Sequence, residues 1–142
     1  MRFLFGLLSI FYVAGIFLFA DSTLASDLAP LNPYSLLHIP VYGILAVLLV
    51  FSCLPMKQIA ENPANAKKYL LLSGLIALGI AIADETHQAY LPGRFASVSD
   101  VFLDVLGISL VLFGIHRFLV RRKRQGRNAL KESRGPQSPS RS

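Results

Sequence analysis

The chain has 142 residues, enough for one domain. It is 54% hydrophobic and 15% charged, and its mean hydropathy is +0.54. Soluble domains usually carry about a quarter of charged residues, so this composition excludes an ordinary soluble protein. The net charge of +6 arises from residues 121–142, which contain eight Lys or Arg and one Glu. A basic tail differs from a basic folded surface, and we expect no nucleic-acid partner.

Four apolar runs follow one another along the chain. A helix needs about 20 residues to cross the hydrocarbon core of a bilayer, with a range of about 17–25. The runs cover residues 3–20, about 36–54, 69–83 with a polar continuation through 88, and about 98–120. The first run exceeds the apolar core of a cleaved signal peptide, about 7–15 residues, so we expect it to be retained. The sequence therefore predicts an all-α integral membrane four-helix bundle in residues 1–120.

Two further features of the spans concern their packing and their ends. Short links favour up-and-down neighbours. Small residues allow close helix contact in a membrane, and the candidates are Gly74, Gly79, Gly107 and Gly114. Residues 121–142 are polar, basic and rich in Pro, Gly and Ser, a composition that predicts a disordered tail. Binding of this tail to anionic lipid headgroups is an open alternative to a simple topological anchor.

The distribution of basic residues predicts the orientation. Arg2, the lysines of the 55–68 link and the tail fall on one side if the chain crosses the membrane four times. The 21–35 link has no Lys or Arg, and the 89–97 link has only Arg94. Basic segments stay in the cytoplasm, so both termini and the basic tail are predicted to be cytoplasmic.

Polar side chains gather at the opposite, extracytoplasmic ends of three spans. Residues four apart share a helix face, which pairs His38 with Tyr42, Asp84 with Gln88, and Asp100 with Asp104. Ser97 followed three residues later by Asp100 is typical of a capping box. We therefore predict a polar pocket at one membrane depth, with the candidate residues His38, Tyr42, Asp84, Glu85, His87, Gln88, Arg94, Asp100 and Asp104.

The depth of Asp104 makes this pocket a candidate functional site. Asp104 lies roughly 10 Å along its helix, where an unpaired carboxylate costs at least ~2.5 kcal/mol. Arg94, in the Pro92-Gly93 turn, can bind a carboxylate or a phosphate through two parallel hydrogen bonds. Pairing of an acid with Arg94 for purely structural reasons is the alternative. Buried ionisable clusters in membranes nevertheless indicate function.

Other chemistries have weaker signals. Asp84, His87, Asp100 and Asp104 are acceptable metal ligands, but their spacing matches no diagnostic pattern, so we predict no metal and no cofactor. Nucleophilic catalysis by Ser97 or Ser99 with His87 is not indicated, because these serines lie in no nucleophile-elbow motif. Paired carboxylates beside an anion-binding Arg favour general acid–base chemistry, if the protein is an enzyme.

One combination of motifs is similar to a known family. A DExxQ run begins at Asp84 and is followed by Pro92-Gly93-Arg94. Asp100 comes next, with another polar residue four positions later and then Gly107. His38, Tyr42 and Gly43 head the second span. Over residues 36–115 this pattern resembles the VanZ-like membrane proteins. The family often has Asn where this chain has Asp104.

The resemblance implies a small multi-pass protein of the bacterial cytoplasmic (inner) membrane with a role at the cell envelope. The family is named for a protein linked to low-level resistance to teicoplanin, a glycopeptide. Two functions stay open. The first is a non-enzymatic pocket for a lipid-linked cell-wall precursor, an anionic headgroup or the glycopeptide. The second is an interfacial enzyme acting on a lipid-linked or phosphate-bearing substrate. A proton or ion pathway through Asp104 is disfavoured, because the inner halves of the spans hold almost no ionisable residues.

Overall fold

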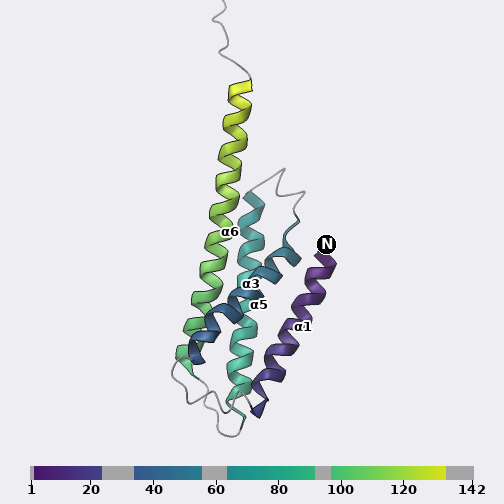
Figure 1. Ribbon diagram of the computed structural model, residues 1–142, viewed down its shortest axis with the longest axis vertical. Helices are drawn as coiled ribbons and strands as arrows, with labels where there is room; N and C mark the ends of the chain where they lie inside the picture. Colours follow the sequence, from purple (N-terminus) through teal and green to yellow (C-terminus); the bar gives the residue numbers. More distant parts are fainter. Residues whose placement is uncertain (1, 24–33, 56–63, 92–96, 134–142) are drawn as a thin grey trace, which may run out of the picture.

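The computed structural model describes residues 2–23, 34–55, 64–91 and 97–133. Within these ranges the chain forms four long helices and no strand. The helices are α1 (Arg2–Ala20), α3 (His38–Cys53), α5 (Ala64–Gln88) and α6 (Val98–Ser133), and the 3-10 turn η1 (Tyr34–Leu37) leads into α3 (Figure 1). All four are long and apolar enough to cross a membrane, with α3 counted together with η1 as Ser35–Cys53. This confirms the predicted all-α integral membrane four-helix bundle.

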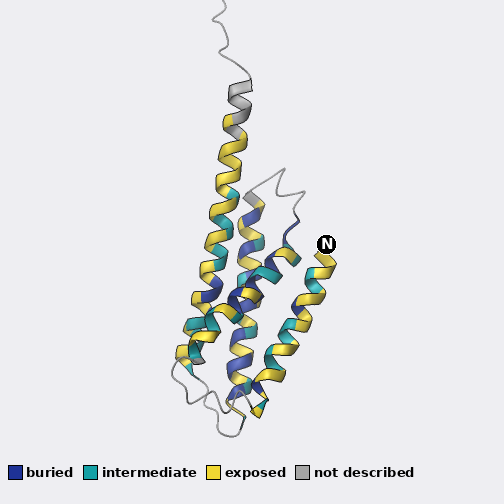
Figure 2. Ribbon diagram, viewed as in Figure 1, coloured by how far each residue is buried: buried dark blue, intermediate teal, exposed yellow. Residues whose placement is uncertain are grey.

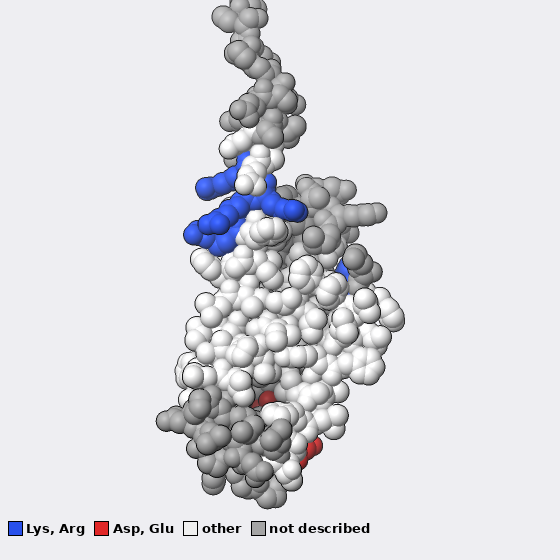
Figure 3. All heavy atoms as spheres, viewed as in Figure 1, with Lys and Arg blue, Asp and Glu red and all other residues white. Residues whose placement is uncertain are grey.

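The four helices alternate in direction. The start of α1, the end of α3, the start of α5 and the end of α6 lie at the upper end of the molecule in Figure 1. The opposite helix ends lie at its lower end. Lys and Arg side chains lie toward the upper end and acidic side chains toward the lower end (Figure 3). The polar residues at 38, 84, 85, 100 and 104 therefore share the lower end, which places them at a common depth.

The core forms around α3, which packs against the other three long helices. Its buried residues meet two alanines of α5 and one isoleucine of α6 in a single cluster: Tyr42, Leu45, Ala46, Leu49, Ala77, Ala81 and Ile108. The outward faces of the helices keep large apolar side chains exposed, such as Phe3, Leu75 and Phe113 (Figure 2). Exposed apolar faces on every span are expected where acyl chains replace water as the solvent.

Glycine sets the approach of α3 to α6. A Cβ atom on Gly107 would overlap the Ile39 carbonyl group, so the two backbones touch at this level. A Cβ atom on Gly74 would lie 2.7 Å from Leu112 Cδ1. Gly107 and Gly74 thus permit close contact as expected. Gly79 and Gly114 do not, because a Cβ atom there would have no described atom within 4 Å.

The upper end of α3 is held by α1. The Arg2 guanidinium donates to the carbonyl oxygens of Ser52 and Cys53, at 3.0 and 3.2 Å. The last carbonyls of a helix have no partner within the helix, and a cation also complements the helix dipole there. Pro55 cannot continue a helix, which explains why α3 ends at Cys53.

Two helices are longer than the apolar runs that predicted them. α5 begins at Ala64 rather than near residue 69. It continues through the polar residues to Gln88, as predicted for a helix that spans the membrane. α6 continues to Ser133, past residue 120, where the sequence predicted a change to a disordered tail. Residues 121–133 include Arg, Lys, Gln, Ala, Leu and Glu, all good helix formers, and extending an existing helix avoids a new nucleation step.

Candidate functional site

The first turns of α3 carry the two side chains that organise the lower end. His38 Nδ1 lies 2.9 Å from Asp104 Oδ1, and the Tyr42 hydroxyl donates to Asp84 Oδ2 at 3.1 Å. The two rings are nearly parallel, with centroids 6.2 Å apart, as the four-residue spacing indicates. One face of α3 therefore contacts an acid of α6 and an acid of α5.

Asp84 is the centre of the α3–α5 contact. It is 3% exposed, and its Oδ2 also accepts a hydrogen bond from Gln88 Nε2 at 3.0 Å. Its Oδ1 is buried and has no hydrogen-bond partner among the described residues. Tyr42 and Gln88 thus fix the carboxylate through one oxygen and leave the other available.

The α6 acids both face His38. Asp104 is completely buried, and Asp100 Oδ2 lies 3.9 Å from His38 Nε2. With Asp104 ionised, the short contact requires the imidazole proton on Nδ1, because an ionised carboxylate only accepts hydrogen bonds. Asp104 Oδ2 and Asp100 Oδ1 are buried without a hydrogen-bond partner in the described part of the chain.

Glu85 links α5 to the start of α6. Its Oε2 accepts the Ser97 backbone N–H at 2.8 Å, and its Oε1 is buried without a described partner. The predicted capping box of Ser97 and Asp100 is therefore wrong, because the N–H that Asp100 would accept goes to Glu85. A carboxylate from a neighbouring helix serves the positive end of α6 equally well.

The charge balance of this cluster is unusual. Asp84, Glu85 and Asp104 are each at most 5% exposed, and the Asp100 side chain is 17% exposed. No Lys or Arg side chain contacts them among the residues that the structure describes. A buried carboxylate must be protonated or paired with a cation, because an unpaired charge in a low dielectric is strongly disfavoured.

The remaining predicted residues stand apart from this cluster. His87 points to the end of α1, where its Nε2 lies 3.5 Å from Asp21 Oδ1 and its ring lies 5.3 Å from Phe17. Residue 87 is one position before Gln88, so a turn of about 100° carries it to another face of α5. Arg94 and the Pro92-Gly93 turn lie outside the described residues.

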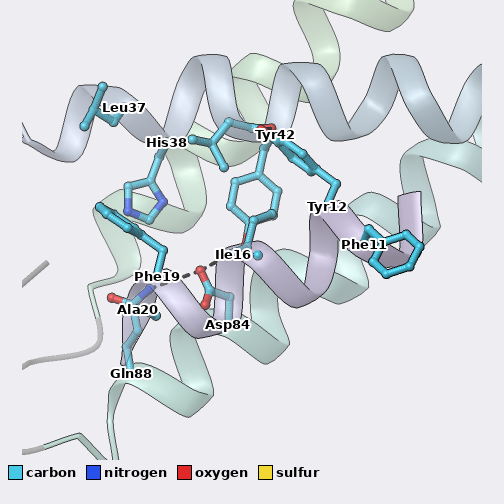
Figure 4. A pocket seen from close by; sticks show the side chains of 12 residues that line it. Phe11, Tyr12, Ile16, Phe19, Ala20, Leu37, His38, Tyr42, Asp84 and Gln88 are labelled. Carbon is cyan, nitrogen blue, oxygen red and sulfur yellow. Dashed lines mark hydrogen bonds between the residues drawn. The ribbon is translucent and has the colours of Figure 1, made fainter. Parts of the chain in front are cut away.

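A cavity of about 440 Å³ opens beside the cluster, between α1, α3 and α5. Figure 4 shows Tyr42, Asp84 and Gln88 grouped at one side of this cavity and aromatic and aliphatic residues of α1 around it. The α1 side comprises Phe11, Tyr12, Gly15, Ile16, Phe19 and Ala20. We did not predict any α1 residue in the site. Their recurrence at three- and four-residue intervals was the available signal, since it marks one helix face.

Four apolar helices with a buried ionisable cluster at one end define a small polytopic membrane protein. The family model described as VanZ/LLP1 matches residues 3–120, and the chain belongs to this family. The match begins in α1 and ends within α6, so it includes all four spans. No curated protein and no solved structure matches the chain.

Proposed function

We propose that this VanZ-family protein binds an amphipathic molecule of the cell envelope in the cavity between α1, α3 and α5. The observation that carries the proposal is the composition of the cavity wall. One side is largely apolar and comes from α1, and the other presents His38, Tyr42, Asp84 and Gln88. Its volume of about 440 Å³ falls in the usual range of ligand pockets, about 300–1,000 Å³.

The position of the cavity suits a lipid-linked ligand. It lies at the lower helix ends, where a span approaches the membrane surface. An acyl or prenyl chain would lie against Phe11, Ile16 and Phe19, and a polar headgroup would meet the Asp84 side. A lipid-linked cell-wall precursor and a lipid-tailed glycopeptide of the teicoplanin type share this chemistry. By binding such a glycopeptide in the cavity, the chain would contribute to glycopeptide resistance.

We propose the bacterial cytoplasmic membrane from the family, and we infer the orientation from charge. In the bacterial cytoplasmic membrane, segments rich in Lys and Arg stay inside. Lys67 and Lys68 lie near the start of α5, and the basic residues 121–124 lie in the second half of α6, toward the end opposite the cavity. The proposal therefore places both termini and the 121–142 segment in the cytoplasm, and the cavity on the outside.

An interfacial enzyme is the alternative function. It is favoured by Asp84 Oδ1 and Glu85 Oε1, two buried carboxylate oxygens without a hydrogen-bond partner in the described part of the chain. Asp84 or Glu85 would act as general acid or base on a lipid-linked or phosphate-bearing substrate, with Asp100 and Asp104 assisting. Arg94 would stabilise developing negative charge.

A pair of glycine variants tests the binding proposal. Gly15 lines the cavity and Gly79 does not, and a Cβ atom at either position meets no described atom within 4 Å. Gly15→Leu should fill the cavity and reduce co-purified envelope lipid at least about tenfold, measured by native mass spectrometry. Gly79→Leu gains the same helix propensity and should keep wild-type occupancy. Equal lipid content in wild type and Gly15→Leu would refute the cavity as the binding site.

The same preparation separates the two functions. Asp84→Asn should keep the captured molecule in both cases, because Asn still hydrogen-bonds to Tyr42 and Gln88. If the protein is an enzyme, the wild type converts that molecule and Asp84→Asn and Asp104→Asn do not. If it is a binding protein, all three release it unchanged. Arg94→Ala tests the proposed contact to phosphate.

A further inference from the structure

We propose that His38, Glu85 and Asp100 bind one divalent transition-metal ion, of the Mn²⁺ or Zn²⁺ type, and that Asp104 orients the histidine. The three ligands come from α3, α5 and α6, so the ion would join three helices at the lower end. The inference concerns a site beside the cavity: His38 lines the cavity, whereas Glu85 and Asp100 do not.

The three side chains already converge. One donor atom from each lies within 4.8 Å of the others. Ligands about 2.1 Å from a metal lie roughly 3–4 Å apart. Small side-chain rotations therefore suffice to close the site. The His38 and Asp100 side chains, 11% and 17% exposed, lead to the surface and provide a path for entry.

The histidine has the hydrogen bond expected of a metal ligand. A metal-bound His typically donates its other ring N–H to a carboxylate, which fixes the tautomer and the ring orientation. Here Nδ1 lies 2.9 Å from Asp104 Oδ1, and in the Nδ1–H tautomer it donates to that carboxylate. In this tautomer Nε2 carries no proton and lies 3.9 Å from Asp100 Oδ2. An imidazole fixed in this way, with the lone pair of Nε2 facing Asp100, is oriented to bind a metal ion.

The carboxylate oxygens give an independent indication of a bound cation. Glu85 is 5% exposed, and its Oε2 is occupied by the Ser97 N–H, which holds the carboxylate in place. Its Oε1 and Asp100 Oδ1 are buried without a hydrogen-bond partner in the described structure. Buried polar atoms of this kind are rarely left unsatisfied. A cation held by Glu85 and Asp100 would give these carboxylates a partner and reduce the excess negative charge.

The donor types select the class of ion. Mg²⁺ and Ca²⁺ prefer sites made wholly of oxygen, whereas an imidazole nitrogen with carboxylates suits Mn²⁺, Zn²⁺ or Fe²⁺. The sequence predicted no metal because each ligand lies on a different helix. Such a site leaves no short, regular spacing of ligands in the sequence, because the donors meet only after three spans have packed together.

Metal titration of the purified, chelator-treated protein tests the site. We expect one Mn²⁺ or Zn²⁺ per chain, measured by Mn²⁺ electron paramagnetic resonance and by calorimetry with Zn²⁺. Glu85→Gln keeps the side-chain size and should weaken binding at least about tenfold. Asp104→Asn should weaken it about 10–100-fold by releasing the imidazole. Asp21→Asn removes an acid at the same end, outside the site, and should leave the dissociation constant unchanged.

A spectroscopic measurement on the wild type removes any dependence on the stability of variants. Electron spin echo modulation of bound Mn²⁺ should show coupling to one imidazole nitrogen, and ¹⁵N-histidine labelling should change that coupling. His87→Gln should retain the coupling and His38→Gln should lose it. Absence of binding, binding of Mg²⁺ or Ca²⁺ but not of Mn²⁺ or Zn²⁺, or Mn²⁺ binding without nitrogen coupling would each overturn the proposal. None of these outcomes is read from the amount of bound lipid, so they are distinguishable from failure of the proposed lipid binding.

Discussion

At the scale of single residues, Tyr42 connects the hydrophobic core with the polar cluster. Its ring is 1% exposed and packs in the main core, while its hydroxyl donates to Asp84. A buried hydroxyl without a partner would destabilise the fold, so the position requires an acceptor. Asp84 provides that acceptor and is itself positioned by the bond. A side chain of this kind couples the integrity of the core to the geometry of the site.

Tyr42→Phe should remove this bond and little else. Hydrogen bonds between membrane helices contribute on average about 0.6 kcal/mol, and up to about 1.7 kcal/mol. We expect the free energy of unfolding to fall by about 0.5–2 kcal/mol, because Asp84 then keeps only Gln88 as a described side-chain donor. Unfolding of the two proteins in mixed micelles measures this change in free energy. Tyr90→Phe is the control, since Tyr90 is 83% exposed, and an equal effect of both changes would argue against the Tyr42–Asp84 bond.

At the scale of elements, the crossing of α3 and α6 brings His38 to Asp104. Gly43 and Gly107 lie where the two helices touch, about one turn beyond these residues. Because the backbones are in contact there, the histidine at the start of α3 reaches the inward-facing acid of α6. The close approach is therefore part of the construction of the site as well as of the bundle.

Gly107→Ala should disturb this crossing. The added Cβ atom would overlap the Ile39 backbone, and backbone cannot move aside as a side chain can. Overpacking of this type costs about 1–3 kcal/mol. Gly114→Ala, in the same helix but with no described atom within 4 Å of the new carbon, should instead gain up to about 1 kcal/mol of helix propensity. Thermal unfolding of the two variants in detergent should move in opposite directions, and equal shifts would contradict the backbone contact.

At the scale of the whole molecule, charge is divided between the two ends. The described Lys and Arg residues lie toward the upper end, and the buried acids lie at the lower end (Figure 3). A transmembrane bundle with this division has a preferred orientation, because basic segments resist transfer across the membrane. The orientation decides whether the cavity meets envelope molecules or cytoplasmic ones.

Cysteine labelling of intact cells tests that orientation, in a Cys53→Ser background. Ser99 and Lys123 are both exposed; Ser99 lies in the first turn of α6, and Lys123 lies beyond its apolar run. Ser99→Cys should react with a membrane-impermeant maleimide added outside, and Lys123→Cys only after permeabilisation. The reverse pattern would place the cavity in the cytoplasm and remove the basis for binding an extracytoplasmic ligand.

The sequence by itself determined which segments are helices, which of them can span the membrane, and which polar residues share a face. Hydropathy and the 3.6-residue period are properties of one segment, so they need no information about its neighbours. The pairs His38 with Tyr42, Asp84 with Gln88, and Asp100 with Asp104 followed from spacing alone. The same motifs indicated the VanZ family, and the family match confirms that assignment.

The tertiary structure decided how each helix is rotated about its own axis against the others. That rotation joins His38 to Asp104 and Tyr42 to Asp84, turns His87 toward Asp21, and gives the Ser97 N–H to Glu85. It also brings α1 across from the acids and so forms the cavity. Periodicity fixes which residues share a face but not what that face meets, because the partner is chosen by packing between segments far apart in the chain.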